Sequence, residues 1–367
     1  MPETAADPEI ELAECVLPAG NLSETLRFFV DTLGFRLDSI MPADDPRIAQ
    51  LSGYGLRLRL DTAHEGDAGV LRLGTARGVD RAALVAPNRT RIEFGPARLP
   101  IRLPPLQPSP GIQHFDDRPG AWKSGRAGMQ YRDLIPDRQG GQFIASHIRI
   151  PVGGPVGDNV HYHDIRLQLI YCHRGWVRLV YEDQGDPFVM RAGDCVLQPP
   201  RIRHRVLESS DGLEVIEIGS PAEHMTHLDH TMQLPTGRRL PARDYDGQRF
   251  VFHQAEKARW SHLPDSGWAL RDLGLAAATG GLVDARVLRR EPASESADVP
   301  ALQDRMFAFG FVLRGSMSLR VDRLPATRLT AGDAFVVPSG MQPQFDDCSD
   351  DGELLQVALP AWQPAMP

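Results

Sequence analysis

Hydrophobic and polar residues follow two different periods near the N-terminus. Residues 9–17 alternate, as in a β-strand with one buried face. Asn21 then suits the N-cap of a helix, with Glu24 three residues later, and Gly34 suits its end. Three short strands are predicted next. The pattern therefore predicts a small α+β domain of order βαβββ within residues 1–100. The apolar face of the helix consists of Leu22, Leu26, Phe29, Val30 and Leu33. The three strands are predicted at residues 35–41, 48–52 and 56–60.

Proline dominates the next segment, and short apolar runs dominate the remainder. Residues 101–127 hold prolines at positions that break regular structure, which predicts a linker. From residue 128 onward, short runs rich in Val, Ile and Leu are separated by Gly and Pro. Such a pattern is typical of antiparallel sandwiches or barrels, so the fold class is predicted to be mainly β.

An internal repeat divides this β region in two. The run Tyr131-Arg-Asp-Leu134 recurs as Leu270-Arg-Asp-Leu273, and Gly193-Asp recurs as Gly332-Asp. The period of about 140 residues is the size of a domain rather than of a solenoid unit. Two β domains of similar fold are therefore predicted, at residues 128–235 and 236–367.

Charge and cysteine usage restrict the partners and the location. The net charge is -8 and no Lys/Arg cluster occurs, so neither nucleic acid nor an anionic membrane is an expected partner. No apolar stretch approaches the length of a membrane span, and the N-terminus shows no evident signal peptide. The four cysteines are scattered without CxxC spacing. They are expected to be small buried apolar residues, and the predicted location is the cytoplasm.

The fragment with the clearest chemistry is His161-Tyr-His163-Asp-Ile-Arg-Leu-Gln168. Side chains alternate along a strand, so His161 and His163 are expected to point to the same side. Gln168 follows on a strand that can pair with the first, and His204 lies on a later one. Three imidazoles and one amide oxygen suit a divalent transition metal and leave room for water or substrate.

These two blocks resemble the two motifs of the cupin family, and the repeat resembles a bicupin. Spacing agrees at every metal-ligand position, and the resemblance covers roughly residues 128–362. It implies two cupin barrels and a homodimer. Four positions depart from the motifs, with Gln in place of the usual Glu ligand, Pro and Arg in place of two Gly residues, and Glu in place of Asn. They are Gln168, Pro155, Arg201 and Glu208.

The second repeat lacks a comparable ligand set. The motif places the ligand positions of that repeat at Ala301, Gln303, Ala308 and Pro343. One metal is therefore predicted, in the first cupin, with the second cupin as a degenerate scaffold. The alternative that the second barrel binds a ligand without a metal also remains open.

Other polar residues are candidates for catalysis or substrate binding beside the metal. Continued strand alternation from His204 makes Glu208 a candidate acid or base. Arg149 on the first barrel strand and Arg166 near Gln168 are candidate anion clamps. Three histidines spaced by three residues form either a second metal site or a solvated tail, namely His224, His227 and His230.

The N-terminal domain carries a second resemblance. The run from Asn21 to Phe35 resembles the first helix of the glyoxalase/vicinal-oxygen-chelate family. That family usually carries a metal-binding His at the place that Glu14 occupies here. The domain is therefore expected to be structural or substrate-shaping.

Taken together, the residues and the cupin resemblance favour a metal-dependent enzyme. A neutral Gln168 leaves the site more positive than a Glu would, which favours a small anionic substrate. The preferred hypothesis is a non-haem Fe(II) dioxygenase of a dicarbonyl, enol or hydroxylated aromatic acid. One alternative is a redox-neutral isomerase, cyclase or lyase that uses Zn, Ni or Mn as a Lewis acid. Another is a cupin that only binds or senses a ligand.

Overall fold

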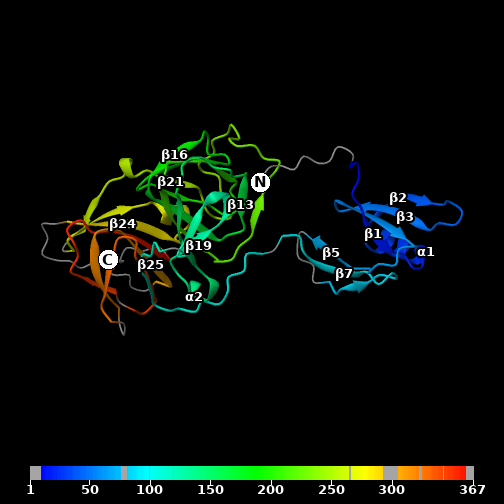
Figure 1. Cartoon of the computed structure of the whole chain (residues 1–367), viewed down its shortest axis with the longest axis horizontal. Coiled ribbons are helices and arrows are strands. Elements are labelled where there is room, and N and C mark those ends of the chain that lie inside the picture. The colour runs from blue at the N-terminus through cyan, green and yellow to red at the C-terminus, as the bar shows by residue number, and fades with distance from the viewer. Residues whose placement is uncertain are drawn as a thin grey trace. The chain divides into compact units, whose positions relative to one another are not determined.

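The computed structural model describes residues 10–75, 81–98, 100–118, 120–263, 266–291, 305–321, 325–341 and 343–360. The chain forms two compact units, Met1–Pro100 and Ile101–Pro367 (Figure 1). Across the described residues, no helix is long and apolar enough to cross a membrane.

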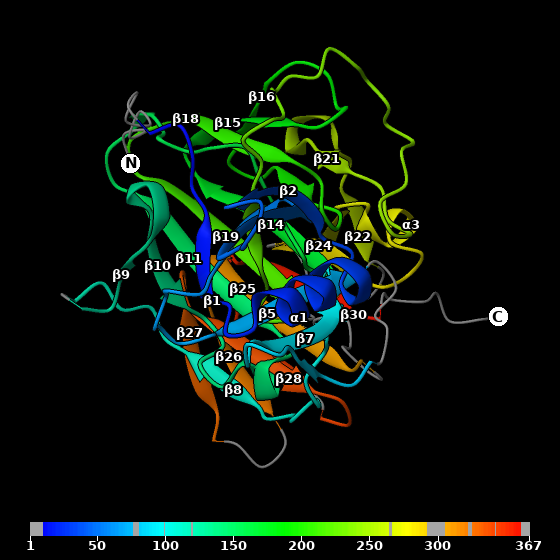
Figure 2. The ribbon, with the colours of Figure 1, turned by 90° about the vertical axis from the view of Figure 1, so that its right-hand side faces the viewer.

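The first unit contains a βαβββ module and a smaller sheet (Figures 1 and 2). The module's strand order is β1-β4-β3-β2, with β1 parallel to β4. The smaller sheet has the order β5-β7-β6. The Asn21 side chain accepts a hydrogen bond from the backbone N of Glu24, as the capping prediction requires. The elements are β1 (Cys15–Pro18), α1 (Leu22–Arg27), η1 (Phe28–Thr32), β2 (Arg36–Met41), β3 (Ile48–Gly53), β4 (Leu56–Asp61), β5 (Val70–Thr75), β6 (Leu84–Val85) and β7 (Arg91–Pro96).

The polar face of the module's sheet holds Glu14, just before β1. Its Oε2 accepts a hydrogen bond from Gln50 Nε2 at 3.0 Å, and its Oε1 lies 4.0 Å from Arg59 Nη1. The apolar face packs under α1 with the buried side chains of Ala49 and Leu51. Glu14 is thus part of a polar network on the face opposite the domain core.

The first barrel of the second unit consists of two facing sheets. One has the order β21-β17-β14-β19-β11-β10-β9, and the other β16-β15-β18-β13-β20, with β12 beside β18. Their elements are β9 (Lys123–Ser124), η2 (Arg126–Gly128), β10 (Gln130–Asp133), α2 (Arg138–Gly141), β11 (Ile144–Ile150), β12 (Gly154–Pro155), β13 (His161–His163), β14 (Leu167–Arg174), β15 (Trp176–Tyr181), β16 (Phe188–Arg191), β17 (Cys195–Leu197), β18 (His204–Ser209), β19 (Leu213–Ser220), β20 (Thr226–Leu228) and β21 (Val251–His253).

The second barrel repeats this plan, and apolar side chains fill its described interior. Phe335 and Phe345 pack there with Trp268 and Met317. Of the four predicted ligand positions, Ala308 and Pro343 lie on β25 and β29, while Ala301 and Gln303 lie outside the described residues. The elements are β8 (Gly111–Gln113), η3 (Ala255–Lys257), β22 (Ser261–Leu263), β23 (Trp268–Asp272), α3 (Leu275–Ala278), β24 (Asp284–Arg290), β25 (Phe307–Arg314), β26 (Ser316–Val321), β27 (Thr327–Thr330), β28 (Ala334–Pro338), β29 (Pro343–Asp346) and β30 (Glu353–Leu359).

The two barrels exchange short strands. Strand β8 precedes the first barrel in sequence but pairs with β28 of the second, while β21 of the second repeat pairs with β17 of the first. The predicted linker over residues 101–127 therefore carries ordered strands, β8 and β9. Between the barrels lies a large apolar core, in which the Phe143 and Phe307 rings stack 4.0 Å apart.

The repeated sequence motifs meet at this junction. Arg132 Nη2 donates to Gly332 O at 2.8 Å, and its counterpart Arg271 donates to Gly193 O at 3.2 Å. Each Arg of one repeat thus binds the Gly-Asp turn of the other. This reciprocity explains why the Arg-Asp-Leu and Gly-Asp runs recur together.

Candidate metal centre

Three histidines converge at one end of the first barrel. His161 and His163 lie on β13, and His204 lies on β18 directly opposite His161 in the antiparallel ladder. One ring nitrogen from each residue lies within 4.8 Å of the other two. The structure therefore brings together the three imidazoles that the sequence singled out.

The outer ring nitrogens of these histidines are already occupied. His161 Nδ1 donates to Asn159 O at 2.8 Å, and His204 Nδ1 donates to Ile202 O at 3.0 Å. His163 Nδ1 hydrogen-bonds with Thr226 Oγ1 at 2.8 Å. The carbonyl partners fix the tautomers of His161 and His204, with the proton on Nδ1 and a lone pair on Nε2, the nitrogen that can bind a metal.

Burial keeps these rings neutral, which is the form that binds metals. It lowers the pKa of His161 and of His204, and it lowers the pKa of His163 to about 2. Neutral, oriented imidazoles suit a borderline divalent cation, so the donor set fits one.

Gln168 lies beside this cluster at the start of β14, within a hydrogen-bonded chain. Its Oε1 accepts from Gln198 Nε2 at 3.0 Å, and its Nε2 donates to Glu217 Oε1 at 3.0 Å. Gln198 Nε2 also lies 3.3 Å from His204 Nε2, and Tyr181 Oη donates to Gln198 Oε1 at 2.5 Å. The Gln168 amide is thus linked to His204 through Gln198, and it contacts the Glu217 carboxylate on its other side.

The three histidines line a cavity of about 210 Å³. At about 30 Å³ for each liquid water, that is the volume of about seven waters, which suits a small substrate. Its walls are mostly apolar, and most of its polar side chains are linked to the histidines by hydrogen bonds. The apolar lining is Met129, Ile148, Ile150, Ile170, Val177, Leu179, Met190, Val206, Leu213 and Val215, and the polar lining is Arg126, Tyr131, His161, His163, Gln168, Gln198, His204, Glu217 and Thr226.

Two charged residues in this lining were not among the sequence candidates. Glu217 on β19 reaches Gln168, and burial raises the pKa of its carboxyl group. Arg126 in η2 donates from Nη1 to Asp158 Oδ1 and from Nη2 to His161 Nε2, both at 2.8 Å. Their position depends on strand register and on a turn, and neither lies in a recognisable motif.

Glu208, predicted as an acid or base, is not among the cavity residues. Leu179 pairs with Val206 but Arg178 pairs with Glu208, so a β-bulge at Leu207 interrupts the alternation. Val206 lines the cavity, and Glu208 instead forms an ion pair with Arg178 at 3.2 Å.

The two predicted anion clamps also lie outside the cavity lining. Ile148 and Ile150 of β11 face the cavity, so Arg149 between them faces away, bonded to Gln130 and Asp117. Arg166 precedes the first residue of β14, so the strand's alternation does not extend to it.

The three spaced histidines have separate surroundings. The His224 ring lies 5.3 Å from the His163 ring, centroid to centroid. His227 Nε2 is 2.8 Å from Asp164 Oδ2, and His230 is exposed. Within the described residues, the potential metal cluster comprises His161, His163 and His204 alone.

Comparison with known proteins agrees with this architecture. Residues 146–219 match the family described as cupin domain, a range that includes all four candidate ligands. No curated protein matches the chain significantly.

Among solved structures, a salicylate 1,2-dioxygenase variant from Pseudoaminobacter salicylatoxidans has a TM-score of 0.51 at 15% identity, over 70% of this chain and 85% of that one. Oxalate decarboxylases from Lactobacillus farciminis and Bacillus subtilis have TM-scores of 0.49 and 0.48 at 13% and 11% identity. They cover 68% and 71% of this chain, and 86% and 77% of their own chains. The predicted fold class, mainly β with two cupin barrels, is confirmed.

Proposed function

We propose that the protein is a metal-dependent cupin enzyme that acts on a small oxygenated organic substrate, most specifically a non-haem Fe(II) dioxygenase. The observation that carries this proposal is the convergence of three neutral imidazoles in a cavity with mostly apolar walls. An apolar wall suits the body of a hydroxylated aromatic acid, enol or dicarbonyl, and the polar end suits its oxygens. Salicylate, named in the dioxygenase that shares the fold, is a hydroxylated aromatic acid.

His161, His163 and His204 would hold the metal, with Gln168 as a candidate fourth ligand. When bound, Fe(II) would supply a Lewis acid and a redox centre for O2. Arg126 lies beside His161, so it can orient an anionic group of the substrate. The apolar walls exclude bulk water from the reacting atoms.

Glu217 favours a second candidate function, a redox-neutral isomerase, cyclase or lyase. Its carboxyl group lines the cavity beside Gln168, and burial raises its pKa, which favours a role as a general acid. With Zn, Ni or Mn as Lewis acid, Glu217 would move a proton on the substrate without any need for O2.

The metal content of anaerobically purified protein tests the site, with His163→Ala beside the exposed His230→Ala. We expect about one metal per chain in wild type and in His230→Ala, and most of it lost from the folded His163→Ala variant. A full complement of metal in His163→Ala would show that the proposed metal site is wrong.

Iron with substrate-dependent O2 uptake supports the dioxygenase, and equal anaerobic turnover supports the isomerase or lyase. Ligand binding without metal or turnover would mean a sensor.

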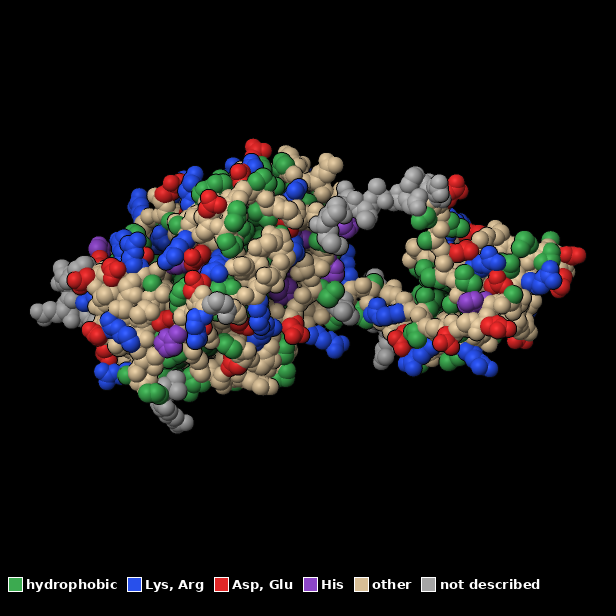
Figure 3. Space-filling model, in the orientation of Figure 1, with side chains coloured by type: hydrophobic (Ala, Val, Ile, Leu, Met, Phe, Trp, Pro, Cys, Tyr) green, Lys and Arg blue, Asp and Glu red, His purple; other side chains and the backbone are tan. Residues whose placement is uncertain are grey.

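Charged side chains on the face in Figure 3 are of mixed sign, which agrees with a small-molecule partner rather than nucleic acid. The homodimer and the cytoplasmic location stay predictions, and light scattering tests the first.

A further inference from the structure

The guanidinium of Arg126 and a metal ion require the same atom of His161. His161 Nδ1 carries the proton that it donates to Asn159 O, so Nε2 offers a single lone pair to the cavity. Arg126 Nη2 lies 2.8 Å from that nitrogen and can only donate to it. The lone pair can therefore accept from Arg126 or bind a cation, but not both.

The surroundings hold Arg126 close to this nitrogen. Its Nη1 donates to Asp158 Oδ1 at 2.8 Å, and the Asp158 side chain is 1% exposed. Asp158 Oδ2 is itself fixed by the backbone N of Val206 at 3.0 Å. The neighbouring Ala127 has a positive φ of 54°, a conformation that residues other than glycine seldom adopt. Arg126 thus has a defined anchor, and its second nitrogen is free to change partner.

We propose that Arg126 competes with the metal for His161 Nε2, and that an anionic substrate relieves this competition by taking the guanidinium. The inference rests on the proposed metal-dependent function and adds a regulatory step at the same site. A carboxylate on the substrate offers two oxygens that pair well with a guanidinium. Because coupling between two ligands is reciprocal, such a substrate must tighten metal binding, and the metal must tighten substrate binding.

The test measures metal affinity rather than turnover. Full-length wild type, Arg126→Met and Arg178→Met are titrated with Co²⁺ against a chelating indicator, alone and with saturating benzoate or phenol. Arg178→Met is the matched control, because Arg178 pairs with Glu208 outside the cavity lining. If Arg126→Met does not fold, Arg126→Gln removes the charge and retains an amide that can bond Asp158.

Without organic ligand, we expect Arg126→Met to bind Co²⁺ about tenfold more tightly than wild type, as loss of one charge-assisted hydrogen bond implies. Benzoate should tighten Co²⁺ binding severalfold in wild type and in Arg178→Met, and much less in Arg126→Met, whereas phenol should have little effect. Equal or weaker Co²⁺ binding by Arg126→Met would overturn the competition. An equal benzoate effect in all three proteins would overturn the relief by substrate. Loss of Co²⁺ binding from wild type itself would instead refute the proposed metal site.

Discussion

At the residue scale, Glu217 places a carboxyl group beside Gln168, the position at which the cupin motif usually has a Glu. Its Oε1 receives the hydrogen bond from Gln168 Nε2, so it lies one side chain behind the candidate ligand. Burial raises the pKa of this carboxyl group, so it holds a proton more readily than an exposed Glu would.

We expect Glu217→Gln to lower kcat by about 100-fold or more, because general acid–base groups contribute on that order. Glu208→Gln is the matched control, since Glu208 lies outside the cavity lining and should leave kcat unchanged. Steady-state kinetics on the substrate found by screening check both. The same kcat for the two variants would exclude an acid–base role for Glu217.

The histidine trio was predictable because its signal is local: two positions on one strand and a third at a fixed spacing. Glu217 was not, because its position depends on the register that pairs Ile170 with Glu217 across two strands. Glu208 was misplaced because alternation fails at a bulge. No pattern along the sequence revealed which turn would bring Arg126 to the cavity.

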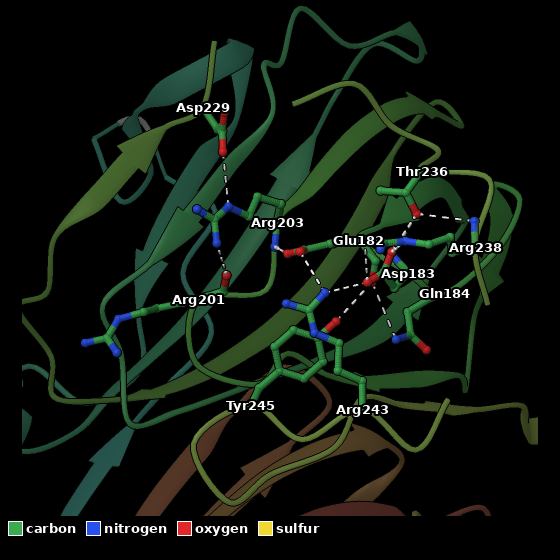
Figure 4. Close-up of polar contacts among 10 residues, drawn as sticks. All are labelled: Glu182, Asp183, Gln184, Arg201, Arg203, Asp229, Thr236, Arg238, Arg243 and Tyr245. Carbon is green, nitrogen blue, oxygen red and sulfur yellow. Dashed lines mark hydrogen bonds and ion pairs between the residues drawn. The ribbon is translucent and has the colours of Figure 1, made fainter. Parts of the chain in front are cut away.

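At the scale of elements, a polar cluster links the segment that connects the two barrels to the residues just after β15 (Figure 4). The connecting segment contributes Thr236, Arg238 and Arg243. Asp183 accepts hydrogen bonds from Thr236, Arg238 and Arg243, and Arg243 also binds Glu182. Although burial alone would raise the pKa of Asp183, these donors lower it. Tyr181, two residues before Asp183, donates a hydrogen bond to Gln198 beside the histidines, so this anchor supports the site.

We expect Asp183→Asn to reduce the free energy of unfolding by about 1–3 kcal/mol, because it leaves buried hydrogen bonds without their charge. Asn tolerates the positive φ of 58° at this position, so the backbone is not the cause. Urea denaturation measures the loss, and the exposed Asp186→Asn should match wild type. An unchanged midpoint for Asp183→Asn would show that the cluster contributes nothing to stability.

The repeat and the first helix could be predicted from the sequence, whereas the exchanged strands could not. The repeat period predicted a duplicated β domain, and the Asn21 cap placed the helix at the N-terminus of the chain. The exchanged strands β8 and β21 have only three residues each, too few for a periodic pattern. Their apolar residues Ile112, Val251 and Phe252 pack against the cores only once the partner barrel is in place.

For the whole molecule, two histidines at the junction between the barrels introduce a dependence on pH. The rings of His147 and His173, from the first barrel, lie 5.5 Å and 5.3 Å from the ring of Phe311 on β25 of the second. Burial lowers the pKa of His147, and it lowers the pKa of His173 to about 4. Unfolded histidines titrate near 6.5, so below that pH the unfolded chain binds more protons than the folded one. These groups therefore stabilise the fold above about pH 6.5, and their contribution is lost as the pH falls toward 4.

The second repeat suggests the variant that tests this, since Leu313 replaces His173 at the matching position. We expect His173→Leu to lose less thermal stability than wild type between pH 7 and pH 5, whereas the exposed His230→Gln should follow wild type. Thermal unfolding at the two pH values gives the comparison. Parallel losses in all three proteins would assign the acid sensitivity to other groups.

The strand exchange determines which pieces of this protein can exist alone. A fragment ending at residue 235 would keep β17 but lose β21, leaving an open sheet edge that invites pairing with other chains. A fragment beginning at residue 236 would likewise lack β8 and expose β28. During synthesis, the first barrel must wait for residues 251–253 before its sheet is complete. We therefore expect the two barrels to fold as one body, although the sequence repeat divides them into two.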